Sequence, residues 1–179
     1  MTRHTRFYLI LVASWLAIAV TARVIPHVAN LSPFAALVMV MGCQLSRKAS
    51  ITIAMLALLL SDMLLSMTMG YTVFGNWSLF TYSGFGMIAL SSHYLQTHRK
   101  FGQVLLYGAT MVVGYWLWTN FGTWLMSALY PHTYAGLVAC YTAAIPFLQR
   151  SAISALIFVP IFLGMIRFVD YRLKGILDA

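Results

Sequence analysis

The sequence predicts an all-α membrane protein with six transmembrane helices and a short helix in the last outer loop. Of its 179 residues, 61% are hydrophobic and only 8% are charged, whereas about a quarter of the residues in a soluble domain are charged. Apolar runs recur along the chain, and a span needs about 20 mostly apolar residues. Basic residues gather on alternate connections between these runs. We therefore expect residues 1–179 to form a single six-helix transmembrane domain.

The apolar runs place the six spans in order. The second run is short and rich in methionine, and it is joined to the third by Arg47 and Lys48. After the fifth run, residues 121–148 form a long aromatic connection, with a short helix expected near 135–144 that stops before Pro146. The six predicted spans are residues 7–25, 33–45, 49–67, 79–96, 101–120 and 151–169.

The first span has an alternative interpretation as a cleaved signal peptide. Residues 1–22 have a basic start, an apolar run and a small-residue site at Val20-Thr21-Ala22. The apolar run nevertheless continues to Ile25, beyond the usual length of such a peptide, and its removal would spoil the charge pattern. We expect it to remain as a span.

The basic residues predict the orientation of the chain. Four clusters fall on one side of a six-span protein, and the positive-inside rule makes that side cytoplasmic. The opposite connections, residues 26–32, 68–78 and 121–149, contain no Lys or Arg. We expect a multi-pass protein of the bacterial cytoplasmic (inner) membrane with both termini in the cytoplasm. The clusters are Arg3 and Arg6; Arg47 and Lys48; Arg99 and Lys100; and Arg167, Arg172 and Lys174.

Three charged residues depart from this pattern. Arg23 and Arg150 fall at the outer ends of the first and last spans, and Asp62 is the only acid before Asp170. Asp62 lies fourteen residues beyond Lys48, roughly 21 Å along a helix. An ionisable group at that depth costs about 2.5–3.5 kcal/mol unless it is paired or hydrated. Asp62 therefore either pairs with Arg23 or Arg150 as a helix lock, or lines a polar cavity open to the outer face.

Further polar and aromatic residues are predicted in the same outer layer. Some of the aromatic ones fit an interfacial belt, but a belt does not explain the amides and histidines. In a binding site, the arginines and His27 would donate hydrogen bonds, the amides would hold polar edges of a solute, and the indoles and Tyr141 would stack on it. The predicted substrate-binding residues are Arg23, His27, Asn30, Asp62, Asn76, Trp77, Asn120, Trp124, His132, Tyr141, Gln149 and Arg150.

Other chemistry has little support in the sequence. No carboxylate pair, nucleophile elbow or phosphate-binding loop is present, so we expect neither an enzyme nor an ATPase. The positive charge is a topology signal, not one for nucleic acid. We expect no cofactor and no bound metal, although His27, His132 and Asp62 could together bind a transition metal. Cys43 and Cys140 lie in apolar stretches.

The architecture resembles the substrate-binding S component of energy-coupling-factor vitamin transporters. Residues 36–48 and 60–62 are similar to that group's second and third spans, in which a glycine-bearing helix turns through a basic loop into a helix with an outer acid. Ala13 and Ala17 resemble its small-residue motif for docking on a coupling subunit that works with ATPases. Three other blocks resemble a set of uncharacterised bacterial membrane proteins, which implies no activity. These blocks are residues 23–33, 119–124 and 136–147.

The leading functional hypothesis is an uptake subunit. It would bind a vitamin-like or cofactor-precursor solute in an outward-facing pocket and pass it inward, either with an ATP-driven coupling module or alone by facilitated diffusion. The main alternative is an assembly subunit in which an Arg–Asp pair locks helices together. Less favoured are a membrane-embedded enzyme using His27 or His132 and a cobalamin or transition-metal transporter. In the cobalamin case, the resemblance implies a cysteine sulfur on cobalt, for which Cys140 is better placed than Cys43.

Overall fold

The protein is helical throughout the part of the chain that the structure describes, residues 3–25, 32–96 and 100–177. We analysed a computed structural model, in which these residues form seven α-helices and one 3-10 helix, with no strand. The prediction of an all-α fold is confirmed. The elements are α1 (Arg3–Val24), α2 (Phe34–Gln44), α3 (Arg47–Met69), α4 (Ser78–Ser91), η1 (Ser92–Gln96), α5 (Phe101–Met126), α6 (Tyr134–Ala143) and α7 (Ile145–Leu177).

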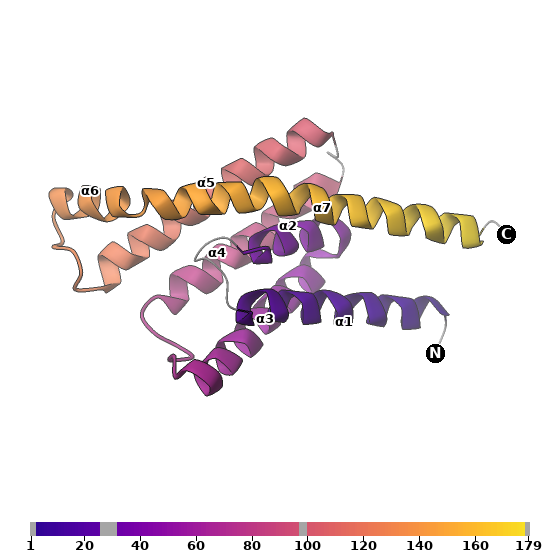
Figure 1. Cartoon of the computed structure of the whole chain (residues 1–179), viewed down its shortest axis with the longest axis horizontal. Coiled ribbons are helices and arrows are strands. Elements are labelled where there is room, and N and C mark those ends of the chain that lie inside the picture. The colour runs from indigo at the N-terminus through magenta and orange to yellow at the C-terminus, as the bar shows by residue number, and fades with distance from the viewer. Residues whose placement is uncertain (1–2, 26–31, 97–99, 178–179) are drawn as a thin grey trace.

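Six of the helices alternate in direction (Figure 1). One end of the bundle carries the connections 70–77 and 127–133, and we call it the loop end. At the other end, the terminal end, α1 begins and α7 ends. Helices α1, α3 and α5 run toward the loop end, whereas α2, α4 and α7 run back from it. Residues that are distant in the sequence therefore meet at the same level of the bundle.

Helix α2 forms the centre of the molecule. Nine of its eleven residues are buried, and it packs against α1, α3, α4, α7 and η1. A helix that is apolar on all sides needs protein or lipid around it, and here neighbouring helices supply that cover. At 1.5 Å per residue it is roughly 16 Å long, about half the hydrocarbon thickness of a bilayer. The second predicted span is therefore a short central helix.

Close packing of α2 depends on one glycine. An ideal Cβ on Gly42 would lie 2.5 Å from Ser92 Cβ and 2.9 Å from the Ala89 carbonyl oxygen. Both distances are shorter than van der Waals contact, so a side chain here would force the elements apart. Gly42 therefore allows α2 to approach the junction of α4 and η1.

Two segments in the described part are long and apolar enough to cross a membrane. They are α3 and residues Ile145–Met165 of α7. Other apolar helical stretches are shorter: Ala13–Val24, Phe34–Gln44 and Tyr134–Ala143. The prediction of helices that can span a membrane is thus confirmed for these two.

The region predicted as a long connection is mostly helical. Helix α5 continues to Met126, because Asn120 and Gly122 do not break it, and the next proline is Pro131. Helix α7 already begins at Ile145, because Pro146 falls in its first turn, where a proline needs no hydrogen-bonded N–H. Only the connection 127–133 separates α5 from α6, which lies close to the predicted 135–144.

Candidate functional site

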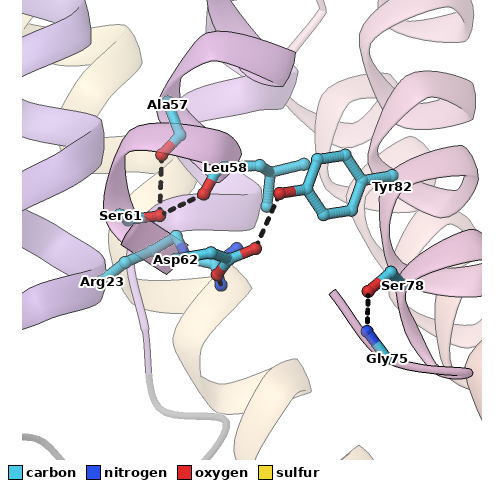
Figure 2. Close-up of polar contacts among 8 residues, drawn as sticks. All are labelled: Arg23, Ala57, Leu58, Ser61, Asp62, Gly75, Ser78 and Tyr82. Carbon is cyan, nitrogen blue, oxygen red and sulfur yellow. Dashed lines mark hydrogen bonds and ion pairs between the residues drawn. The ribbon is translucent and has the colours of Figure 1, made fainter. Parts of the chain in front are cut away.

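An ion pair between the partly buried Arg23 and the buried Asp62 joins α1 to α3 near the loop end. Nη2 of Arg23, in the last turn of α1, lies 2.6 Å from Oδ1 of Asp62. The Asp62 side chain is only 5% exposed and that of Arg23 only 17% exposed. Of the two arginines that the sequence offers, Asp62 pairs with Arg23 (Figure 2).

Asp62 reaches the interior because it continues the buried face of α3. The buried residues of this helix are three and four positions apart, the spacing of one helix face. Ser61, beside it, donates its hydroxyl to the carbonyl oxygens of Ala57 (2.7 Å) and Leu58 (2.9 Å). Because Ser61 satisfies itself within α3, it does not occupy the Asp62 carboxylate (Figure 2). The buried set is Ser50, Ile53, Ala54, Ala57, Leu58, Ser61 and Asp62.

Two further helices hold this pair. Tyr82 of α4 donates its hydroxyl to Asp62 Oδ2 at 2.8 Å, so both carboxylate oxygens accept a hydrogen bond. The Arg23 guanidinium lies 5.2 Å from the centre of the Phe34 ring of α2, a cation–π distance. We call Arg23, Phe34, Asp62 and Tyr82 the Arg23–Asp62 cluster. It links α1, α2, α3 and α4.

The start of α4 is also fixed, which positions Tyr82. The Gly75 backbone N–H donates to Ser78 Oγ at 2.9 Å, and the Ser78 backbone N–H donates to the Gly75 carbonyl oxygen at 2.9 Å (Figure 2). The second bond satisfies one of the N–H groups that an α-helix start leaves without an intrahelical partner, and the first ties the preceding turn to the helix. Tyr82 follows one turn later on α4, where it faces Asp62.

A cavity of about 280 Å³ lies beside Arg23, between α2, α4, α5 and α7. Most of its wall is apolar, and a guanidinium and five hydroxyl groups supply its polar side chains. The polar residues are Arg23, Ser32, Thr81, Tyr115, Ser151 and Ser154. The others are Phe34, Ala35, Ala36, Met39, Phe85, Ile88, Gly108, Met111, Val112, Ala155 and Val159.

The cavity is polar at one end and apolar at the other. Arg23 ends α1, Ser32 precedes α2, Thr81 is in the first turn of α4, and Ser151 and Ser154 lie early in α7, all in the loop-end half of the bundle. The apolar lining residues continue from them toward the terminal end. These deeper residues are Met39, Ile88, Gly108, Met111 and Val159.

One hydroxyl joins two segments of the cavity wall. Ser154 Oγ, in a side chain that is only 3% exposed, donates to the Ser32 carbonyl oxygen at 2.6 Å. This bond joins α7 to the segment before α2, which are 122 residues apart in the sequence. The sequence signal for these cavity hydroxyls was weak, because single Ser and Thr residues are common in apolar helices.

Four of the predicted site residues form a separate group around α5 and α6. Asn120 Nδ2 donates to the Trp116 carbonyl oxygen (2.8 Å), and Trp124 Nε1 donates to that of Pro131 (3.0 Å). The His132 ring lies edge-on to Trp124, with 5.4 Å between centroids. The Asn120 bond lies within α5, whereas the Trp124 bond holds the connection 127–133 against α5.

Tyr141 completes this group, since its hydroxyl donates to the Leu117 carbonyl oxygen at 2.8 Å. None of Asn120, Trp124, His132 and Tyr141 lines the cavity. The structure therefore separates them from Arg23 and Asp62, with which the sequence analysis had grouped them.

The remaining predicted site residues are dispersed. Asn76 and Trp77 are exposed in the connection before α4, where Asn76 Nδ2 donates to the Met126 carbonyl oxygen at 3.4 Å. Gln149 is exposed and Arg150 half-buried on α7, and Arg150 makes no ion pair with a described residue. His27 and Asn30 lie outside the described residues.

The two cysteines are buried away from the cavity. The Cys140 thiol is hydrogen-bonded to the Asn120 carbonyl oxygen at 3.5 Å, and burial raises the pKa of this thiol. Cys43 donates to the Met39 carbonyl oxygen at 3.2 Å. Within the described residues, no three His, Cys, Asp or Glu side chains come together as metal ligands.

The small residues predicted to dock a partner lie on the outside of α1. Ala13 and Ala17 are exposed, whereas Trp15 and Ala19 are buried on the opposite face. Trp15 packs edge-on against Phe162 of α7, with ring centroids 6.2 Å apart. No helix of the described part therefore covers Ala13 and Ala17.

Comparisons with known proteins assign the chain to a family but indicate no activity. No curated protein and no solved structure matches the chain. One family model matches residues 2–176, nearly the whole sequence, and it describes a family of unknown function. On that match, this chain is a member of the DUF6580 family.

Proposed function

We propose that this protein is a membrane subunit for solute uptake, whose transmembrane domain is formed by the six alternating helices α1 to α5 and α7, and which binds a small molecule in the cavity beside Arg23. The solute is passed inward with the help of a separate ATP-driven coupling module, as the resemblance to S components implies. The observation that carries this proposal is the cavity, which combines an apolar wall with a few convergent polar groups at one end. That combination is typical of small-molecule sites, which measure roughly 300–1,000 Å³.

The outer faces of the helices support a membrane location. On α3, a row of leucine and methionine side chains is exposed, including Met67 at 81%. On α7, Ile153, Leu156 and Ile161 are about half exposed or more. Contiguous apolar surface on this scale is unfavourable in water, and lipid removes the penalty. The exposed α3 residues are Leu56, Leu60, Met63, Leu64, Met67 and Met69.

The Arg23–Asp62 cluster supports a prepared binding site. Asp62 balances the charge of Arg23 and fixes the guanidinium through a 2.6 Å contact to Nη2, the one hydrogen bond that this guanidinium makes with the residues the structure describes. An arginine has five N–H donors, so other donors remain for a solute at the polar end of the cavity. A donor that is already held in place loses little freedom when the solute binds.

The exposed pair Ala13 and Ala17 supports contact with a coupling subunit. In lipid, small residues four positions apart let another helix approach closely. The proposed coupling subunit would dock on this exposed face of α1, opposite the face that buries Trp15 and Ala19.

An assembly subunit is the second candidate, and the cluster itself favours it. Arg23, Asp62 and Tyr82 connect three helices through two short contacts, as expected of a helix lock. The two functions differ in whether the cavity binds a solute, because an assembly subunit needs none there.

The test is to identify what the purified protein holds. We would purify it in mild detergent, denature it, and analyse the released molecules by mass spectrometry and the metals by elemental analysis. We expect one organic molecule per chain. The variant Ala155→Phe, which fills the cavity wall, should lose this molecule, whereas Ile153→Phe, on the exposed face of the same helix, should keep it. A folded wild-type protein that releases nothing would favour the assembly function.

A further inference from the structure

A second, smaller cavity of about 110 Å³ adjoins the apolar end of the first. It lies between α5 and α7, and its wall carries no polar side chain. It shares three lining residues with the central cavity: Gly108, Ala155 and Val159. The full lining is Val104, Leu105, Gly108, Ala109, Ala152, Ala155, Leu156 and Val159.

This small cavity reaches the outer surface of the bundle. Two of its lining residues, Ala109 and Leu156, are exposed, the latter at 61%. Gly108 and Ala109 on α5 and Ala152 and Ala155 on α7 line the gap, and these four small residues leave it unfilled. We call this surface-reaching gap the α5–α7 seam.

Gly108 stands where the two cavities meet. An ideal Cβ on it would have only Met39 Sδ within 4 Å, at 3.8 Å, which is ordinary van der Waals contact. Thus the junction has free space beside α5. On α5 the seam continues from the central cavity toward the terminal end, whereas on α7 the two cavities lie side by side at the same level.

We infer that the solute is an amphiphile with an acceptor-bearing head and one hydrocarbon chain, and that the chain lies in the α5–α7 seam. This inference rests on the proposed function. The head binds at Arg23, Thr81 and Ser151, whose N–H and O–H groups are donors. The chain takes the apolar end, because a hydrocarbon loses no hydrogen bonds there and leaves water. A solute without a chain would leave the seam empty.

The seam also supplies a route of entry. An amphiphile dissolved in the outer part of the bilayer would present its chain to the exposed side of α5 and α7. It could slide between the helices past Ala109 and Ala152 with little obstruction, since neither side chain extends beyond a methyl group. The head would then meet Arg23 without the chain crossing water.

Chain length is the property that tests this inference. We would place the protein in nanodiscs and measure displacement of radiolabelled octanoate by straight-chain carboxylic acids from butanoate to tetradecanoate. The 1-alkanols of the same chain lengths test whether the carboxylate of the head contributes to binding. With affinities referred to the free aqueous concentration of each compound, each buried methylene should tighten binding about fourfold, and the alcohols should bind more weakly than acids of equal length.

Two matched variants distinguish chain binding in the seam from partitioning of the chain into the surrounding lipid. Ala152→Leu fills the seam but does not touch the central cavity, and Ala139→Leu makes the same change on the exposed side of α6. In Ala152→Leu, the gain with chain length should stop several methylenes earlier than in Ala139→Leu, while butanoate binds equally to both. Equal chain-length profiles in the two variants would overturn the inference.

The outcomes distinguish this inference from the proposed function. If none of the acids displaces octanoate, or octanoate itself does not bind saturably, the inference is wrong. The proposed function still stands in that case if denatured protein releases another organic molecule that Ala155→Phe lacks. If no such molecule is released either, both fail.

Discussion

At the scale of single residues, Asp62 is almost fully buried, and its carboxylate therefore depends on the partners around it. One carboxylate oxygen accepts from Arg23 and the other from Tyr82. Removing a charge from water is costly, and the cost is offset only while the partners stay in place. The three side chains must therefore be considered together, because a change in one alters the energy of the others.

Asp62→Asn should destabilise the fold strongly. The amide keeps the shape but loses the charge, which leaves the Arg23 guanidinium buried without a counter-ion. Breaking a buried ion pair in this way costs about 3–5 kcal/mol. We expect a markedly lower midpoint of thermal unfolding in detergent, followed by tryptophan fluorescence.

The double variant Arg23→Gln with Asp62→Asn provides the control for this prediction. With both charges removed, no unpaired ion remains, so the double variant should unfold at a higher temperature than Asp62→Asn alone. If the effects of the two single variants simply add, the contact between Arg23 and Asp62 contributes no coupling energy, and our account of the cluster is wrong.

Tyr82→Phe should have a smaller effect. It removes one hydrogen bond to a charged acceptor, which is worth about 1.5–3 kcal/mol, and keeps the ring. Thermal unfolding in the same detergent measures the loss. Tyr134→Phe removes a hydroxyl from a side chain that is 83% exposed, and it should leave the midpoint unchanged. A similar midpoint for the two variants would show that the Tyr82 bond does not stabilise the fold.

At the scale of helices, the short α2 depends on its neighbours more than any other element. It is too short to span a bilayer and is buried on almost every side. The sequence analysis placed a span here from the apolar run alone. Apolar composition does not distinguish a helix that faces lipid from one enclosed by protein, because both environments exclude water.

Gly42→Ala should therefore destabilise the protein, although alanine favours helices by about 1 kcal/mol over glycine. The added methyl group would meet Ser92 and the Ala89 carbonyl at the distances given above, and overpacking typically costs about 1–3 kcal/mol. Gly114→Ala is the matched control, since nothing lies within 4 Å of its added carbon. That control should unfold at the same or a higher temperature. A stabilised Gly42→Ala would contradict the close packing.

At the scale of the whole molecule, the helices alternate in direction, so the first residues of α1 and the last residues of α7 lie at the same end, the terminal end (Figure 1). The loop end carries the connection 127–133 and the polar end of the cavity. If the positive-inside pattern holds, the loop end faces outward, and a solute would reach Arg23 from outside the cell.

Labelling of introduced cysteines tests this orientation. Leu129 is 75% exposed at the loop end, and Gln103 is exposed at the start of α5, at the terminal end. A membrane-impermeant maleimide should label Leu129→Cys in intact cells with a permeabilised outer envelope, but Gln103→Cys only after lysis. The native Cys43 and Cys140 are buried and serve as the unlabelled background. The reverse labelling pattern would show the opposite orientation.

Part of the candidate site could be predicted from the sequence. Arg23 and Asp62 stood out because a charge in an apolar run needs a partner, and the structure pairs them. The group of Asn120, Trp124, His132 and Tyr141 could not be placed in the same way. Amides, indoles and phenols can satisfy their hydrogen bonds on a neighbouring backbone, as these do, and so their presence does not indicate a cavity.

The sequence by itself determined that the chain is all-helical and that Asp62 needs a cation, because composition and periodicity act residue by residue along the chain. Only the tertiary structure decided that the cation is Arg23 and not Arg150, that α2 is enclosed, and that Ser32, Thr81 and Ser154 line one cavity beside Arg23. The physical reason is that a partner or a cavity is a property of several helices packed together. Its position depends on their relative depth and rotation, which no single segment encodes.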